Sequence, residues 1–205
     1  GGNRVAKKVA AQAAKNLVPT TLELGGKSPT IIGTNANMAL AAERILFSKT
    51  LNAGQICLSP DYIFVKKDEE RNLISELQKA YSKFFPEPNS HNQTSMVNKH
   101  HLKRMNSYLL DATKKGATVE SLGNNDDHNK NMISTKIVTE VNDSMDVMKH
   151  EIFGPVLPIM TYESISDVVD YINKNDNPLG LYYFGRSQSE QNFVINNTRS
   201  GGVTV

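Results

Sequence analysis

The sequence contains a single cysteine, Cys57, and its surroundings suit a nucleophile. Cys57 follows a glycine-containing loop, residues 52–56, and precedes a predicted strand. Nucleophiles favour such loops, because neighbouring backbone N–H groups can face an oxyanion that develops during attack. A lone cysteine is also commonly a small, buried hydrophobic residue. The local sequence leaves both interpretations of Cys57 open.

Glu23 is the second candidate for chemistry, because it lies between Leu22 and Leu24 at the end of a predicted strand. We expect it to be partly buried there. Burial favours the neutral form of a carboxyl group and suits it to general-base work near neutral pH. The simpler alternative is a glutamate at a strand edge that pairs with Lys27. Glu23 by itself does not decide between these roles.

The elements that must position these side chains alternate between β-branched runs and helical stretches. Helices are predicted over 4–17, 38–52 and 98–115, over a segment capped by Asp68, and after the capping boxes Ser164-x-x-Asp167 and Ser187-x-x-Glu190. Strands are predicted over 20–24, 29–32, 62–65, 133–139, 156–162, 181–184 and 202–205. This alternation predicts an α/β fold with a doubly wound, mostly parallel sheet flanked by helices. The polar stretch 121–131 is predicted to be a surface loop.

Composition excludes several classes of function. The net charge of the 205 residues is +2 and basic residues are spread along the chain, so no nucleic-acid partner is expected. One cysteine allows no internal disulfide and no cysteine cluster for a metal. His100-His101 is interpreted as a solvated helix face, and we expect no metal site. No apolar run approaches the ~18 residues that would cross a bilayer.

Three segments together resemble the aldehyde dehydrogenase superfamily. Residues 22–29, Leu-Glu-Leu-Gly-Gly-Lys-Ser-Pro, resemble its glutamate signature, and residues 52–57, Asn-Ala-Gly-Gln-Ile-Cys, resemble its cysteine signature. Their spacing is also that of the family. Residues 150–156 resemble the cofactor-facing Glu-x-Phe-Gly-Pro segment. The stretches 60–62 and 97–99 resemble the class 3, or fatty aldehyde, branch, and the resemblance covers essentially the whole chain.

The resemblance implies a mechanism for both candidate residues. Cys57 would attack the aldehyde carbon and form a hemithioacetal, which passes hydride to a nicotinamide and becomes a thioester. Glu23 would then activate the water that hydrolyses the thioester. A CoA-dependent acyl transfer is the alternative within the superfamily. Glu23 argues against it, because a hydrolytic base favours water as the acceptor.

The resemblance also implies a binding site for NAD, or for NADP. Glu151 would hydrogen-bond the nicotinamide ribose, and Phe153 would pack beside the nicotinamide, although an ordinary core aromatic is the alternative for Phe153. Gly1 and Gly2 would begin a glycine turn at a helix N-terminus that helps to hold the cofactor. The second glycine of that turn is replaced here by Ala6.

The resemblance sets expectations for the whole protein. Residues 1–19 would be the end of a cofactor-binding domain and a linking helix, and residues 20–205 a catalytic domain truncated at both ends. A segment without its cofactor domain would be inactive. The substrate would be a fatty or aromatic aldehyde. The parent would be a homodimer in a reducing intracellular compartment, cytoplasmic or attached to the cytosolic face of an organelle membrane through a C-terminal tail.

Overall fold

A seven-stranded sheet forms the centre of the computed structural model, which describes residues 1–86, 93–124 and 126–205. The strand order is β3-β4-β5-β2-β1-β6-β7. Within the described residues, β3 and β4 pair antiparallel and every other pair is parallel. The predicted doubly wound, mostly parallel sheet is therefore confirmed. The strands are β1 (Pro29–Ile32), β2 (Tyr62–Lys66), β3 (Thr118–Ser121), β4 (Lys136–Thr139), β5 (Val156–Tyr162), β6 (Gly180–Phe184) and β7 (Gly202–Thr204).

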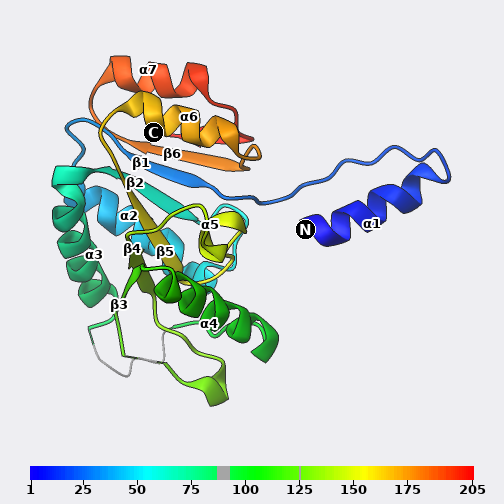
Figure 1. Cartoon of the computed structure of the whole chain (residues 1–205), viewed down its shortest axis with the longest axis horizontal. Coiled ribbons are helices and arrows are strands. Elements are labelled where there is room, and N and C mark those ends of the chain that lie inside the picture. Colours follow the sequence, from blue (N-terminus) through cyan, green and yellow to red (C-terminus); the bar gives the residue numbers. More distant parts are fainter. Residues whose placement is uncertain (87–92, 125) are drawn as a thin grey trace.

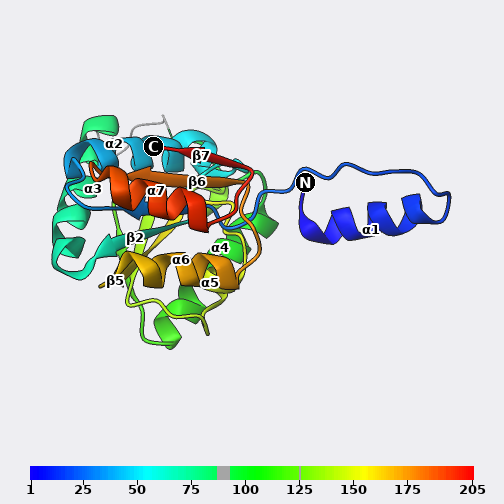
Figure 2. The ribbon, with the colours of Figure 1, turned by 90° about the horizontal axis from the view of Figure 1, so that it is seen from above.

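Helices cover both faces of the sheet (Figures 1 and 2). Two of them pack on one face and four on the other, and the strand residues alternate between the two cores. In β1, for example, Ile32 joins the core beneath α2 and α3, whereas Ile31 joins the core on the opposite face. Burial on both faces explains why the central strands are almost continuously apolar. The helices are α1 (Asn3–Ala14), α2 (Met38–Thr50), α3 (Glu70–Phe84), α4 (Lys99–Lys114), α5 (Asp146–Lys149), α6 (Ile165–Lys174) and α7 (Gln188–Asn197).

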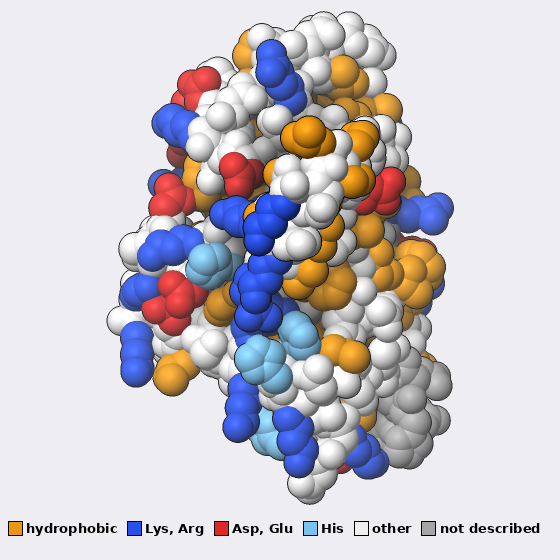
Figure 3. All heavy atoms as spheres, turned by 90° about the vertical axis from the view of Figure 1, so that its right-hand side faces the viewer, with side chains coloured by type: hydrophobic (Ala, Val, Ile, Leu, Met, Phe, Trp, Pro, Cys, Tyr) orange, Lys and Arg blue, Asp and Glu red, His pale blue; other side chains and the backbone are white. Residues whose placement is uncertain are grey.

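Helix α1 stands apart from this body and is joined to it by an extended segment (Figure 1). Ala6 is the buried residue of α1, and its first turn lies at the end of the helix nearest the sheet. Figure 3, which looks at the molecule from this side, shows Lys and Arg side chains in a band beside His side chains.

Several predicted elements differ from the observed ones. The strand predicted over 20–24 is wrong: these residues have no regular structure, because β1 begins to pair with its neighbours only at Pro29. The strand predicted over 133–139 begins at Lys136. The helix predicted over 38–52 ends at Thr50 and continues as a 3₁₀ turn. Strand β3 and helix α5 were not predicted.

The polar stretch 121–131 is more ordered than a bare surface loop, with residue 125 outside the described residues. Asp126 pairs with Lys136 at 2.7 Å, and it also accepts from the backbone N–H of Ser134 at 2.7 Å. The Asp127 side chain caps a 3₁₀ turn over His128–Lys130. Hydrogen bonds to Ser134 and Lys136 order this segment together with Leu122, which packs against the core beneath α2 and α3.

The central strand β2 offers a test of the fold. Ile63 is fully buried between β1 and β5, so truncation to alanine leaves a cavity that the sheet cannot close. We expect Ile63→Ala to lower the free energy of unfolding by roughly 2–5 kcal/mol in urea denaturation. The control Val97→Ala, at a side chain that is 71% exposed, should change it by less than about 0.5 kcal/mol. Equal effects of the two variants would contradict the assignment of β2 to the core.

Candidate active site

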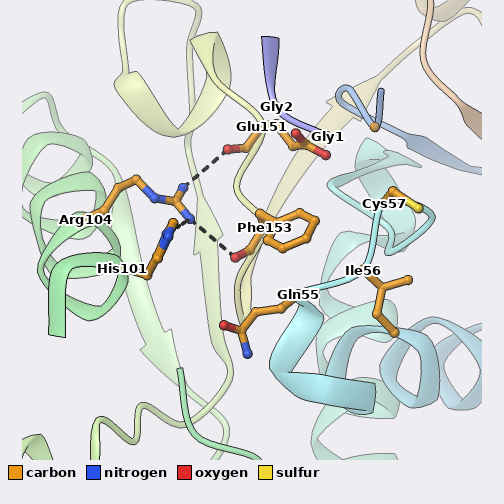
Figure 4. Close-up of a pocket in the computed structure, with 10 residues that line it drawn as sticks. Gly1, Gly2, Gln55, Ile56, Cys57, His101, Arg104, Glu151 and Phe153 are labelled. Atoms are coloured by element: carbon orange, nitrogen blue, oxygen red, sulfur yellow. Dashed lines mark hydrogen bonds between the residues drawn. The ribbon is translucent and has the colours of Figure 1, made fainter. Parts of the chain in front are cut away.

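The amino-terminal ends of β1, β2 and β5 meet at one edge of the sheet, because the three strands are parallel and adjacent. The loop before each strand carries one of the segments singled out in the sequence. A cavity of about 600 Å³ lies among these loops (Figure 4). Five of the six predicted site residues line it, and Glu23 does not. The lining residues are Gly1, Gly2, Gly25, Gln55, Ile56, Cys57, His101, Arg104, Glu151 and Phe153.

The loop that carries Cys57 is strained. Three successive residues before it have left-handed backbone, with φ of 51° at Asn52, 55° at Ala53 and 68° at Gly54. A side chain on Gly54 would place its Cβ 2.5 Å from the carbonyl oxygen of Gly154. Cys57 itself is exposed at the cavity and is not a core residue. Strain of this kind is stored at functional loops when the surroundings hold it in place.

A partly buried ion pair ties the three loops together. Lys27 pairs with Asp61, and its ammonium also donates to the carbonyl oxygens of Val147 at 2.9 Å and His150 at 3.1 Å. The other carboxylate oxygen of Asp61 accepts from the backbone N–H of Ile152 at 2.9 Å. Asp61 is only 3% exposed. The pair therefore joins the loop before β1 to the segment before β2 and to the loop before β5.

Lys49 is a second cation beneath the cysteine loop. Its side chain is fully buried and donates to the carbonyl oxygen of Pro60 at 2.9 Å. Burial lowers the pKa of Lys49 from 10.5 to about 8, against the opposing effect of the Asp61 charge.

Glu151 and Phe153 enter the cavity from the loop before β5. The Glu151 carboxylate occupies the position that a side chain on Gly25 would need, so this approach requires glycine. Burial raises the pKa of Glu151 and the charge of Asp61 raises it further, whereas a hydrogen bond from the Gly26 backbone N–H opposes both. Phe153 has left-handed backbone, with φ of 47°, and its ring faces the cavity.

Helix α4 contributes two cavity residues, His101 and Arg104, that the sequence analysis did not identify. His100 is exposed, as expected for a solvated helix face, whereas His101 is partly buried and lines the cavity. Burial lowers the pKa of His101, and the charge of Arg104 lowers it further. The available signal was their separation by three residues, which places both side chains on one face of a helix.

Glu23 is neither partly buried nor paired with Lys27, the two alternatives that the sequence suggested. Its side chain is exposed rather than partly buried, and Lys27, its alternative partner, pairs with Asp61 instead. Its backbone does reach the cavity wall, because the backbone nitrogen of Gly1 donates to the Glu23 carbonyl at 2.9 Å. Two residues later, a Cβ on Gly25 would lie 3.4 Å from the Cα of Cys57. The chain at Glu23 thus runs beside both the glycine turn and the cysteine loop.

Two kinds of feature are absent from the part of the chain that the structure describes. It contains no group of three or more His, Cys, Asp or Glu residues placed to hold a metal ion. It also contains no helix with the length and apolar character needed to span a membrane.

Known proteins match this chain along its whole length. A model described as the aldehyde dehydrogenase family matches residues 1–205. A probable coniferyl aldehyde dehydrogenase of Caulobacter vibrioides is 44% identical over all of this chain and 43% of its own length. Aldehyde dehydrogenase family 3 member A2 of mouse is 36% identical over all of the chain and 41% of its own length.

A solved structure agrees with these matches. The substrate-bound state of Staphylococcus aureus AldH superposes on all of this chain and 44% of its own, with a TM-score of 0.93 and 36% identity. This chain spans less than half the length of each of these relatives.

Lys49 gives the scaffold of the cysteine loop a testable pH dependence. Its pKa is lower in the folded chain than in the unfolded chain, so between pH 8 and 10.5 the unfolded chain binds more protons. The stability of the wild type relative to Lys49→Met should therefore rise with pH through this window, by at most about 3 kcal/mol. Urea denaturation of both proteins at pH 7, 8, 9 and 10 measures the difference. Lys103→Met, at an exposed lysine, is the control. If the difference in unfolding free energy between the wild type and Lys49→Met does not change with pH, the Lys49 ammonium is not buried in the folded chain.

Proposed function

The chain belongs to the aldehyde dehydrogenase family, and from this premise we propose that the whole protein oxidises aldehydes to carboxylic acids with NAD or NADP. The whole protein here means this chain together with any residues that flank it. The observation that carries the proposal is one cavity that brings together an exposed thiol, on the loop before β2, and a half-buried carboxylate and an aromatic ring, on the loop before the adjacent strand β5.

Cys57 is proposed as the nucleophile. Its thiolate adds to the aldehyde carbon, so a carbon–sulfur bond forms and the carbonyl oxygen becomes an oxyanion. Backbone N–H groups of the cysteine loop are suited to stabilise that charge. The exposure of Cys57 at the cavity and the fixed geometry of the strained turn before it support this role.

The cavity residues fit a nicotinamide cofactor. Because Gly25 carries no side chain, the Glu151 carboxylate can lie against it and remain open to the cavity, where it can accept hydrogen bonds from ribose hydroxyls. The Phe153 ring offers a flat apolar surface beside it. Gly1 and Gly2 lie at the N-terminus of α1, where the helix dipole favours phosphate groups. The bound cofactor would supply the hydride acceptor that converts the adduct on Cys57 to a thioester.

Glu23 is proposed as the base that activates water to hydrolyse this thioester and release the acid. The support is its place in the chain, two residues before the point where Gly25 meets the backbone of Cys57. Its exposed carboxylate is accessible to water.

The proposed substrate is an aromatic or long aliphatic aldehyde. Support comes from the C. vibrioides relative, which is named for coniferyl aldehyde, and from the resemblance of residues 60–62 and 97–99 to the fatty aldehyde branch. The apolar side chains of Ile56 and Phe153 in the cavity wall suit an apolar substrate body. The homodimer and the membrane-attaching tail that the sequence resemblance implies stay predictions.

Replacing the nucleophile should separate chemistry from folding. We expect Cys57→Ser in the whole protein to lower kcat by at least about 10³-fold, because a serine hydroxyl without a dedicated base is a far weaker nucleophile. In the wild type, iodoacetamide should label the peptide that contains Cys57, as detected by mass spectrometry. Aldehyde oxidation should be lost in parallel with the labelling. The melting temperature and NADH affinity of Cys57→Ser should match those of the wild type. Retained activity in this variant would exclude Cys57 as the nucleophile.

Replacing the base should stop the reaction one step later. We expect Glu23→Gln to release about one NADH per site in a burst and then to turn over slowly, because the acyl group stays on Cys57. Intact-protein mass spectrometry should detect the acylated chain. The matched control is Glu163→Gln, a change at an exposed glutamate on the connection between β5 and α6. Full steady-state turnover by Glu23→Gln would assign the hydrolytic base elsewhere.

A further inference from the structure

The guanidinium of Arg104 meets the backbone of the loop that carries Glu151 and Phe153 (Figure 4). One terminal nitrogen donates to the carbonyl oxygen of Ile152 at 2.6 Å and to that of Glu151 at 3.4 Å. The other donates to the carbonyl oxygen of Phe153 at 3.4 Å. A single cation from α4 therefore binds three successive carbonyl groups of this loop.

These carbonyl groups converge because the loop turns sharply. Phe153 has a φ of 47°, a left-handed conformation that is unfavourable for a bulky residue. Converging carbonyl dipoles also repel one another, and a cation between them offsets that repulsion. From the opposite side, the Ile152 N–H donates to Asp61. The loop is thus clamped between the Lys27–Asp61 pair and Arg104.

Arg104 is itself held in place from its own helix. Its guanidinium lies 5.4 Å from the ring centroid of Tyr108, a cation–π geometry, and one nitrogen lies 3.4 Å from Nδ1 of His101. The lowered pKa of His101 favours the neutral imidazole, which can accept a hydrogen bond at that nitrogen. Because both terminal nitrogens already donate to protein groups, Arg104 is better suited to order the loop than to bind a cofactor phosphate directly.

We propose that Arg104 is a positioning residue: it fixes the left-handed turn at Phe153 so that the Glu151 carboxylate and the Phe153 ring face the cavity together. Cofactor affinity then depends on Arg104 without contact between Arg104 and the cofactor. This consequence for affinity rests on the proposed function, whereas the ordering of the loop does not.

The first experiment measures the loop in the absence of any cofactor. In Arg104→Met, hydrogen–deuterium exchange of the whole protein should be at least tenfold faster over loop residues 151–154 and unchanged over the strand β5 that follows. Lys103→Met, which removes a charge from an exposed neighbour on the same helix, should leave exchange in both segments unchanged. Unchanged exchange over 151–154 in Arg104→Met, or general acceleration across β5, would overturn the proposal.

The second experiment asks whether Arg104 acts through Glu151. Arg104→Met should raise the NADH Kd and the KM for NAD about tenfold or more, with a smaller change in kcat. Arg104→Lys should recover only part of this loss. Lysine keeps the positive charge, but a single ammonium cannot reach three carbonyl groups. In a double-mutant cycle, the effect of Arg104→Met on the NADH Kd should be clearly smaller in a Glu151→Gln background, where only the position of the Phe153 ring still depends on Arg104. Additive effects would overturn the proposal, since Arg104 would then act by a separate route.

Failure of the proposed function would look different. If the wild type oxidises no aldehyde, the aldehyde dehydrogenase activity is refuted, but exchange over residues 151–154 still decides whether Arg104 orders the loop.

Discussion

The partly buried pair of Lys27 and Asp61 is the interaction on which the arrangement of the site depends. Taking two charges out of water is costly, and the pair is favourable only when its remaining donors and acceptors are satisfied. Here they are satisfied by the backbone of the loop before β5, through the carbonyl groups of Val147 and His150 and the N–H of Ile152. These bonds require the loops before β1, β2 and β5 to lie in one relative position, which is the position that forms the cavity.

Backbone strain lies beside the groups that are proposed to do chemistry. The three left-handed residues 52–54 precede Cys57, and left-handed Phe153 follows Glu151 by two positions. The two strained turns touch each other, because Gly54 packs against the carbonyl of Gly154 with no room for a side chain. Each turn therefore limits the movement of the other. Both are also anchored to ordered strands, so the core of the sheet stabilises conformations that short loops would not hold alone.

The cavity lies at the amino-terminal edge of the parallel strands, whereas open α/β sheets usually bind ligands beyond the carboxyl ends. The position of α1 accounts for the difference. This helix stands outside the sheet, and the glycines at its N-terminus line the same cavity as Cys57 and Glu151. The site is thus formed between the loops of the sheet and a helix that is not part of its layers.

The sequence by itself determined the class of fold and most of the cavity. Apolar and β-branched runs predicted the central strands correctly. The resemblance of three segments to the aldehyde dehydrogenase family singled out Cys57, Glu151 and Phe153, which the structure places at one cavity. The strands and helices could be predicted because the apolar periodicity of each element is a property of neighbouring residues in the chain.

Only the tertiary structure decided which distant groups meet. It paired Lys27 with Asp61 rather than with Glu23, brought His101 and Arg104 to the cavity, and left residues 20–24 without a strand partner. The physical reason is that such contacts depend on strand register, helix placement and the direction of each turn. These are properties of the assembled sheet, and no short stretch of residues specifies them.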